Sequence, residues 1–383
     1  MKQQTMRWTR SAFVRTSAAA AAALATGSGQ PVAAATAAAK PAGWDKLVAA
    51  ANAEGGLTIY GPTSSEGYAA LVTRFERAYP GIKVAFTGGY APPLVTRILA
   101  ERAAGRYIPD IYVGGSTLAL LSLKPAGALE PLEPMLVLPE ILDKSAWFQN
   151  ELWWTDAQKP YINTAFGGVM IPPAYYNTNL AKASDFRSYW DLTNKKWRGK
   201  IVSNDIRIAG PGGVPARFIY KHPGLGSRWF DSFFNGLDVP LATDQRQLVD
   251  WLAQGRYAIS AFINEDEAQT AIVQGLPIAP ISIEHLKEGG AVAPGPGSLS
   301  ALNRAPHSNA AKLYVNWLLS RDGQIAWQEE TKTASLRIDI PKNIPGLYLQ
   351  PIATKGVTYA NGGAENYSVV TATVFGQLIK GRN

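Results

Sequence analysis

The sequence LTIYGPTSSEGYAALVTRFERAYPGIKVAF, at residues 57–86, decides the fold class. It begins with the β-rich run LTIYG (57–61) and continues over 66–80 with apolar residues at helical spacing, which stop at Pro80. A second strand-like run follows at 81–86. A strand, a helix and a strand in this order predict an α/β fold with a mostly parallel sheet and helices on both faces.

The alternation of strands and helices runs through most of the chain but is interrupted once. Residues 151–180 are aromatic and broken by prolines, so they are predicted to form strands and turns that cross between two lobes. Further elements are expected on either side of this region: helices over 92–105, 116–127, 214–222, 228–237 and 307–330, strands over 110–115, 199–205 and 257–262, and a last amphipathic helix near 365–380.

The composition narrows the function classes. The chain has 383 residues, of which 46% are hydrophobic, enough for two lobes with substantial cores. It has no cysteine, which excludes disulfides, thiolate chemistry and cysteine-based zinc sites. Its three histidines, His222, His285 and His307, are far apart and lack the spacing of metal ligands or of a catalytic triad.

The N-terminal segment has the pattern of an export signal. Residues 1–35 carry four basic residues and no acid, followed by an Ala-rich run and small residues suited to cleavage. We therefore expect a soluble protein of the periplasm that starts near residue 35 or 36. Without this segment the 33 remaining basic residues exceed the 29 acidic ones by only four, so no nucleic-acid partner is expected.

Three loops share one architecture, in which a strand is followed by a Gly-, Ser- or Thr-rich turn and the start of a helix. They lie at 61–67, 114–118 and 203–213. In open α/β sheets ligands bind at the carboxyl ends of strands, and helix N-termini favour anionic groups. None of the loops matches a nucleotide fingerprint. The ligand-binding candidates are Ser64, Ser65, Tyr90, Ser116, Thr117, Tyr176, Arg207, Gly210, Gly212, Asn264 and Glu265.

The stretch FINEDEA (262–268) places three carboxylates in consecutive positions after a strand. Asn264 followed by Glu267 three positions on is typical of a capping box, and acids in a first turn are favoured by the helix dipole. A well-capped helix is therefore the simplest interpretation. The alternative is that Asn264 and Glu265 bind a hydroxyl or ammonium group of a ligand at the strand end.

Several segments together resemble the extracellular solute-binding proteins of ABC importers, in the group that includes the ferric-ion-binding proteins. They are YPGIKV (79–84), PDIYVGG (109–115), YYNTNL (175–180), YWDLTNKKWRGKIVSND (189–205) and LYVNWLLSRDGQIAWQEE (313–330). The resemblance covers about residues 45–345 and implies a type II periplasmic-binding-protein fold, with two α/β lobes joined by crossing hinge strands. It implies a monomer that binds a small solute in the cleft between the lobes, with a membrane permease as partner.

The resemblance and the predicted elements together divide the chain. We expect a signal peptide at 1–35, the first part of lobe 1 at 36–165, lobe 2 with the hinge strands at 166–310, and C-terminal helices that return to lobe 1 at 311–383.

The ligand implied by the resemblance depends on one departure from the ferric-ion-binding proteins. Those proteins bind iron through adjacent tyrosines after the strand that here reads AISAFI, where this chain has Asn264-Glu265-Asp266. Tyr175-Tyr176 matches the hinge-side motif instead. We therefore expect an anionic or zwitterionic organic solute, without a cofactor or metal, and keep a ferric-ion or other metal carrier as the alternative.

An enzyme is the second alternative. A secreted α/β hydrolase would need a nucleophile motif or a pair of opposed acids. The chain has no G-x-S-x-G, no usable histidines and no opposed acid pair, so the sequence predicts a binding protein without catalysis.

Overall fold

The computed structural model describes residues 40–62, 65–156, 158–208, 212–342, 357–359 and 372–379. The predicted signal segment, Ser64 and Gly210 lie outside these residues. No helix in the described part of the chain is long and apolar enough to cross a membrane.

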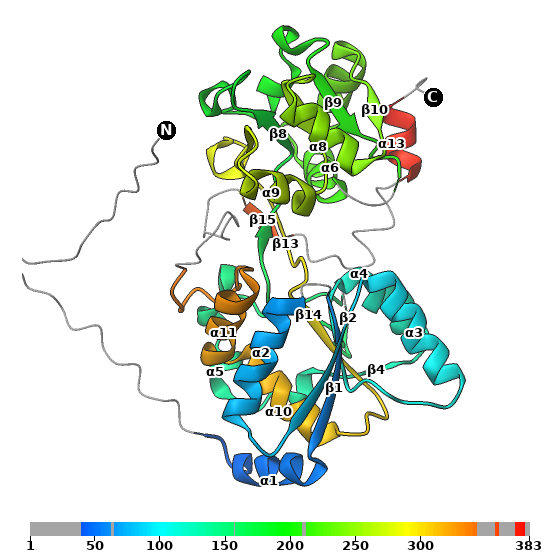
Figure 1. The fold of residues 1–383 in the computed structure, drawn as a ribbon, viewed down its shortest axis with the longest axis vertical. Helices are drawn as coiled ribbons and strands as arrows, with labels where there is room; N and C mark the ends of the chain where they lie inside the picture. The colour runs from blue at the N-terminus through cyan, green and yellow to red at the C-terminus, as the bar shows by residue number, and fades with distance from the viewer. Residues whose placement is uncertain are drawn as a thin grey trace, which may run out of the picture. The chain divides into compact units, whose positions relative to one another are not determined.

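A first mixed sheet is built around the segment that decides the fold class (Figure 1). Its strand order is β2-β1-β3-β14-β6-β5, with β4 paired to β14; β1, β2 and β3 are parallel and β14 is antiparallel to β3. The strands are β1 (Gly56–Gly61), β2 (Lys83–Gly88), β3 (Ile111–Val113), β4 (Leu129–Glu130), β5 (Trp153–Trp154), β6 (Thr164–Ala165) and β14 (Ser298–Leu302). The predicted parallel-rich α/β fold is confirmed here.

Helix α2 (Ser65–Ala78) connects β1 to β2 as predicted. Tyr68, Leu71 and Phe75 recur at helical spacing and are fully buried in the core under the sheet. The helix ends two residues before Pro80, which has no N–H to continue it. Helix α3 (Ala91–Ala103) then leads from β2 to β3, and the short α4 (Ser116–Leu118) follows β3 and continues as a π-helical turn.

A second mixed sheet has the order β10-β9-β11-β8-β12. Strands β9, β10 and β11 are parallel, whereas β8 is antiparallel to β11 and β12. The strands are β8 (Ala174–Asn177), β9 (Ile201–Asn204), β10 (Leu241–Ala242), β11 (Ile259–Ala261) and β12 (Ile278–Pro280), and the helices are α6 (Gly213–Lys221), α7 (Gly226–Phe230), α8 (Gln245–Ala253) and α9 (Glu265–Val273). The three parallel strands therefore end at one edge of this sheet.

Two crossing segments connect the sheets, and the first of them lies in the region where the sequence pattern changes. One leads from β6 through β7 (Val169–Met170) to β8, and the other leads through β13 (Gly290–Ala293) to β14; β7 and β13 pair with each other. They touch at two glycines, because a Cβ on Gly167 would lie 2.7 Å from the Cα of Gly297. The carbonyl oxygen of Gly297 accepts hydrogen bonds from the N–H groups of Phe166 and Gly167, each at 2.8 Å.

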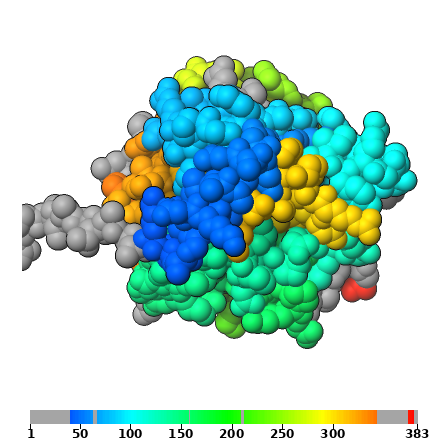
Figure 2. Space-filling view, turned by 90° about the horizontal axis from the view of Figure 1, so that it is seen from below, coloured from blue at the N-terminus to red at the C-terminus, as the bar shows by residue number. Residues whose placement is uncertain are grey.

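Helices α10 (Ser308–Leu319) and α11 (Arg321–Thr331) pack on α1 (Trp44–Glu54) and α2 beside the first sheet. The carboxylate of Glu54, at the end of α1, accepts hydrogen bonds from the N–H groups of Asn309 (3.1 Å) and Ala310 (2.8 Å). It therefore satisfies donors that the first turn of α10 leaves open. Figure 2 shows α1 and the region of α10 side by side on one face.

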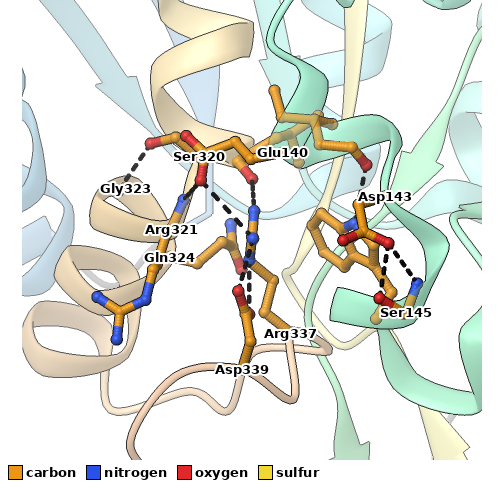
Figure 3. A network of polar contacts seen from close by, with 12 residues as sticks. Glu140, Asp143, Ser145, Ser320, Arg321, Gly323, Gln324, Arg337 and Asp339 are labelled. Carbon is orange, nitrogen blue, oxygen red and sulfur yellow. Dashed lines mark hydrogen bonds and ion pairs between the residues drawn. The ribbon is translucent and has the colours of Figure 1, made fainter. Parts of the chain in front are cut away.

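After α11 the chain runs beside the first crossing segment and is fixed there by a buried arginine (Figure 3). The N–H of Leu336 donates to the carbonyl of Phe166 at 2.7 Å. Arg337, only 1% exposed, forms a bidentate pair with Asp339 at 2.9 and 2.8 Å and lies 3.7 Å from Glu140. Because a buried charge is stable only when it is paired, this network fixes the course of residues 333–342.

The last described helix, α13 (Ala372–Leu378), packs in the second sheet's core. The ring of Phe375 lies 5.4 Å from that of Phe230 in α7. The assignment of all of 311–383 to lobe 1 is therefore wrong for this helix. Its amphipathic pattern indicated a buried face but carried no information about which core would bury it.

Candidate functional site

The carboxyl ends of β9, β10 and β11 are tied together by a chain of side-chain hydrogen bonds. The amide of Gln245, which follows β10, donates to the Oδ1 of Asn204 at the end of β9, at 2.7 Å. The Oε1 of Gln245 accepts a hydrogen bond from the N–H of Asn264, just after β11, at 2.9 Å. This edge is where ligands bind in open α/β sheets, and here its three loops are held in fixed relation.

A glycine allows two of these loops to meet. Gly212, immediately before α6, has φ 78°, and a Cβ at this position would lie 2.3 Å from the Cβ of Phe262 and 2.5 Å from its carbonyl oxygen. Phe262 itself has φ 58°, which is uncommon for a bulky residue. The start of α6 and the turn before α9 therefore touch through backbone, and only glycine fits at position 212.

Arg207, in the loop after β9, is engaged with a neighbouring acid. Its Nε donates to Asp205 Oδ1 at 2.8 Å and its Nη2 to Asp205 Oδ2 at 2.7 Å. The hydrogen bonds from Arg207 lower the pKa of Asp205, and those to Asp205 raise the pKa of Arg207. Part of the guanidinium fork is therefore committed to Asp205, and contact between Arg207 and a ligand stays a prediction.

The residues of FINEDEA form a capped helix start. The Oδ1 of Asn264 accepts hydrogen bonds from the N–H groups of Asp266 (2.8 Å) and Glu267 (3.1 Å), which confirms the expected cap. In a full capping box Glu267 would accept from the N–H of Asn264. Here that N–H donates to Gln245 instead. The cap is therefore part of the network that joins the loops.

The carboxylates beside this cap lie in an unusual environment. Burial raises the pKa of Glu265 to about 7, although the side chain keeps part of its surface exposed. Desolvation by the neighbouring chain, and then the charge of Glu267, raise the pKa of Asp266, although this residue is exposed. Burial also raises the pKa of Tyr175 in β8, and the charges of Glu265 and Asp266 raise it further. Tyr175, Glu265 and Asp266 are therefore close enough to influence one another.

The adjacent tyrosines of β8 lie on opposite faces of the sheet, as successive residues of a strand must. Tyr175 is 4% exposed and packs with apolar residues of α8 and α9. Tyr176, a predicted ligand residue, is 7% exposed and packs 5.4 Å from Phe186 in the core on the other face. The structure thus brings Tyr175, which the sequence analysis passed over, near Glu265. The alternation of side chains along a strand was the signal in the sequence that could have placed Tyr175 and Tyr176 on opposite faces.

The first sheet also presents glycine-rich turns at the ends of its parallel strands. The N–H of Gly89 donates to the carbonyl of Gly61 at 3.0 Å, so the turns after β1 and β2 are joined. Tyr90, at the start of α3, is 74% exposed. Ser65 opens α2, Ser116 is buried at the start of α4, and Thr117 is partly exposed beside it. The participation of these residues in binding stays a prediction.

A buried arginine near the second sheet's edge was not among the predicted site residues. Arg217 of α6 is 8% exposed, and its Nη1 would lie 3.1 Å from a Cβ on Gly213, the first residue of the helix. Its position among apolar residues in the sequence VPARFIYKH was the available signal. Across the described residues, no group of three or more His, Asp or Glu side chains could hold a metal ion.

Residues 61–325 match the family described as bacterial extracellular solute-binding proteins. No curated protein matches the chain significantly.

Solved structures share the fold at low sequence identity. Iron-bound HitA from Pseudomonas aeruginosa is 17% identical, with a TM-score of 0.55 over 79% of this chain and 92% of that one. FutA from Trichodesmium, in complex with iron and citrate, is 18% identical, with a TM-score of 0.56 over 85% and 98%. The substrate-binding protein of an ABC transporter from Agrobacterium tumefaciens is 12% identical, with a TM-score of 0.54 over 83% and 91%. The fold is that of type II periplasmic binding proteins, as the resemblance implied.

Proposed function

We propose, from the premise that this chain belongs to the bacterial extracellular solute-binding proteins, that it captures a small solute in the periplasm and delivers it to the permease of an ABC importer. The observation that carries the proposal is the joined edge of the second sheet, where Asn204, Gln245 and Asn264 hold three loops together. Such an edge suits binding, because its polar groups are already positioned before a ligand arrives.

The solute we propose is organic and anionic or zwitterionic. The starts of α2 and α6 lie at the ends of β1 and β9, where helix N-termini favour a carboxylate or phosphate. The buried cation of Arg217 lies close to the first residue of α6 and supports the same choice. The exposed ring of Tyr90 could cover the bound solute.

A second candidate function is ferric-ion transport. It is favoured by the oxygen donors Tyr175, Glu265 and Asp266, which lie close together and are of the type that hard cations prefer. HitA and FutA, which share the fold, are described with bound iron. We rank this candidate second, because the adjacent tyrosines expected of iron carriers are absent after β11 and those of β8 face opposite ways.

The two candidate functions predict different visible absorption spectra for the purified protein in the presence of ferric iron. The purified protein is expected to show no visible tyrosine-to-iron charge-transfer band after incubation with ferric citrate. A strong band that disappears in Tyr175→Phe would reverse the ranking. A band that disappears in Tyr176→Phe would also contradict the packing of that ring in the core.

A thermal-shift screen of the purified chain tests the proposal as a whole. The solutes should include organic anions, zwitterions, sugars, sugar phosphates and ferric citrate. A ligand at 100 times its Kd adds about 2.7 kcal/mol to the free energy of unfolding, which gives a clear shift in Tm. Stabilisation by one solute class, with no turnover of that solute, is expected. A screen in which no solute stabilises the protein, or in which the stabilising solute is consumed, contradicts the proposal.

A further inference from the structure

We propose that the C-terminal strand β15 (Val357–Tyr359) braces the crossing segments: by pairing with β13, it restrains their bending and limits how far the two sheets move relative to each other. This inference goes beyond the proposed function, because it concerns a motion of the chain and not the solute. It rests on where β13 lies, how it is paired, and where the chain around β15 is anchored.

The first observation is that β13 passes from one core to the other between two consecutive residues. Ala291, 3% exposed, belongs to the core of the second sheet. Val292, which is fully buried, belongs to the core of the first sheet. A change of backbone angles at these residues therefore changes the relation between the two sheets. A restraint on β13 is a restraint on that motion.

The second observation is that β13 is paired on both edges at this point. The strand order is β15-β13-β7, with β15 parallel and β7 antiparallel to β13 (Figure 1). The register of the parallel pair joins Gly290 to Val357, Ala291 to Thr358 and Val292 to Tyr359. Because the backbone groups of β13 are then committed on two sides, bending the strand requires that hydrogen bonds between strands be broken.

The third observation is that the chain is anchored on a different core before and after β15. Before it, the Nζ of Lys342 donates to the carbonyl of Ser335 at 2.7 Å and to Gln328 of α11 at 3.1 Å, beside the first sheet. After it, Phe375 of α13 is fully buried and packs 5.4 Å from Phe230 in the core of the second sheet. These anchors keep β15 at a high effective concentration beside β13. A pairing of three residues can nevertheless open without unfolding either core.

Backbone substitutions in the purified full chain test the brace. Val357→Pro combined with Thr358→Pro removes two adjacent N–H groups, one of which faces β13 because successive residues of a strand point to opposite edges. The matched control is Val357→Ala combined with Thr358→Ala, which keeps both N–H groups. The chain has no cysteine, so Thr73→Cys in α2 and Lys195→Cys beside the second core, both at exposed positions, provide two unique sites for spin labels.

Pulsed electron paramagnetic resonance without solute then measures the distance between the labels. The proline variant should show a broader distance distribution than the alanine control, and faster amide hydrogen exchange over residues 290–292. Faster exchange with an unchanged distribution would show that the pairing does not restrain the sheets. Unchanged exchange would show that β15 does not hold β13. Either result overturns the inference.

A second variant covers the case in which the proline variant does not fold. Replacing residues 357–359 by glycine-serine-glycine keeps the chain length and α13, weakens the strand, and should give the same two changes in smaller measure. Neither variant is measured with a solute. A failure of the brace therefore leaves the proposed function intact, and a failure of the thermal-shift screen leaves the brace intact.

Discussion

Two opposing effects act on the ionisation of the Glu265 carboxyl group. A carboxylate in the first turn of a helix is favoured by the dipole, and the sequence alone supports that simple interpretation. In the folded chain, burial opposes ionisation of the same group and raises its pKa to about 7. A helix that needed only a stabilising acid could carry it at an exposed position, as Asp266 in the same turn does. The cost at Glu265 is therefore consistent with a role in binding.

This cost predicts a pH dependence of stability. The pKa of Glu265 is raised in the folded state from the ordinary 4.5 to about 7, so between these values the folded chain holds a proton that the unfolded chain releases. The contribution of this group to stability is complete below pH 4.5 and is lost as the pH rises through about 7. Glu265→Gln should remove this loss and raise the free energy of unfolding at pH 8 by ~1–2 kcal/mol, allowing for partial exposure.

Urea unfolding of both proteins at pH 5 and pH 8 measures this difference. The other titratable groups near this edge are Tyr175, Asp266, Glu267 and the Asp205–Arg207 pair, and all are retained in the variant. A variant that is less stable than the parent at pH 8 would show that Glu265 acts as an ordinary helix-start acid.

Arg207 carries a second prediction at this scale. Its bidentate pair with Asp205 holds the loop after β9, and the predicted contact with an anionic group of the solute would add a charge-assisted hydrogen bond of ~1.5–3 kcal/mol. Arg207→Ala should therefore weaken binding of the solute roughly 10- to 100-fold with the fold intact. The control is Arg246→Ala, because Arg246 pairs with Asp250 on the exposed face of α8. Equal affinities of the two variants in calorimetry would place Arg207 outside the site.

At the scale of elements, Gly212 couples α6 to the turn before α9. Gly212→Ala adds a Cβ that would lie 2.3 Å from Phe262 and also strains a residue at φ 78°. Gly199→Ala is the matched control, since Gly199 has φ 72° but no atom within 4 Å of the added Cβ. The control should lose ~1–2 kcal/mol of stability through the left-handed backbone alone. Gly212→Ala should lose more stability than the control and should also weaken solute binding. If thermal unfolding shows equal losses of stability for the two variants, the contact between Gly212 and Phe262 contributes nothing measurable.

The sequence predicted elements better than it predicted which side chains converge. The strand and helix of 57–86 follow from local periodicity, and α2 and β2 appear as expected. The alternation of Tyr175 and Tyr176 across β8 is also local, but only the pairing of β8 with β11 shows which face meets α9. The Asn204–Gln245–Asn264 network joins three separate loops, so no spacing in the sequence could reveal it. For the same reason the amphipathic helix α13 gave no indication of the core that buries it.

For the whole molecule, the predicted export fixes where the chain should begin after processing. The basic start and Ala-rich run of residues 1–35 predict cleavage near residue 35 or 36. Mass spectrometry of a periplasmic extract should detect a chain that starts there. An intact chain carrying Met1 and recovered from the cytoplasm would contradict export and, with it, the delivery of a solute to an importer.

The central claim is that the solute is bound by loops at the strand ends of both sheets. Two crossing segments join the sheets, and they touch at Gly167 and Gly297. A solute that contacts both sheet edges can shift the protein toward a closed form, because only that form makes both sets of contacts. A permease could then distinguish the loaded protein from the empty one.

Small-angle X-ray scattering with and without the solute found in the screen tests this claim most directly. At saturation, with tight binding established by calorimetry, the account predicts a smaller radius of gyration for the loaded protein. An identical radius of gyration under those conditions would indicate a static pocket on one sheet and would contradict capture by both.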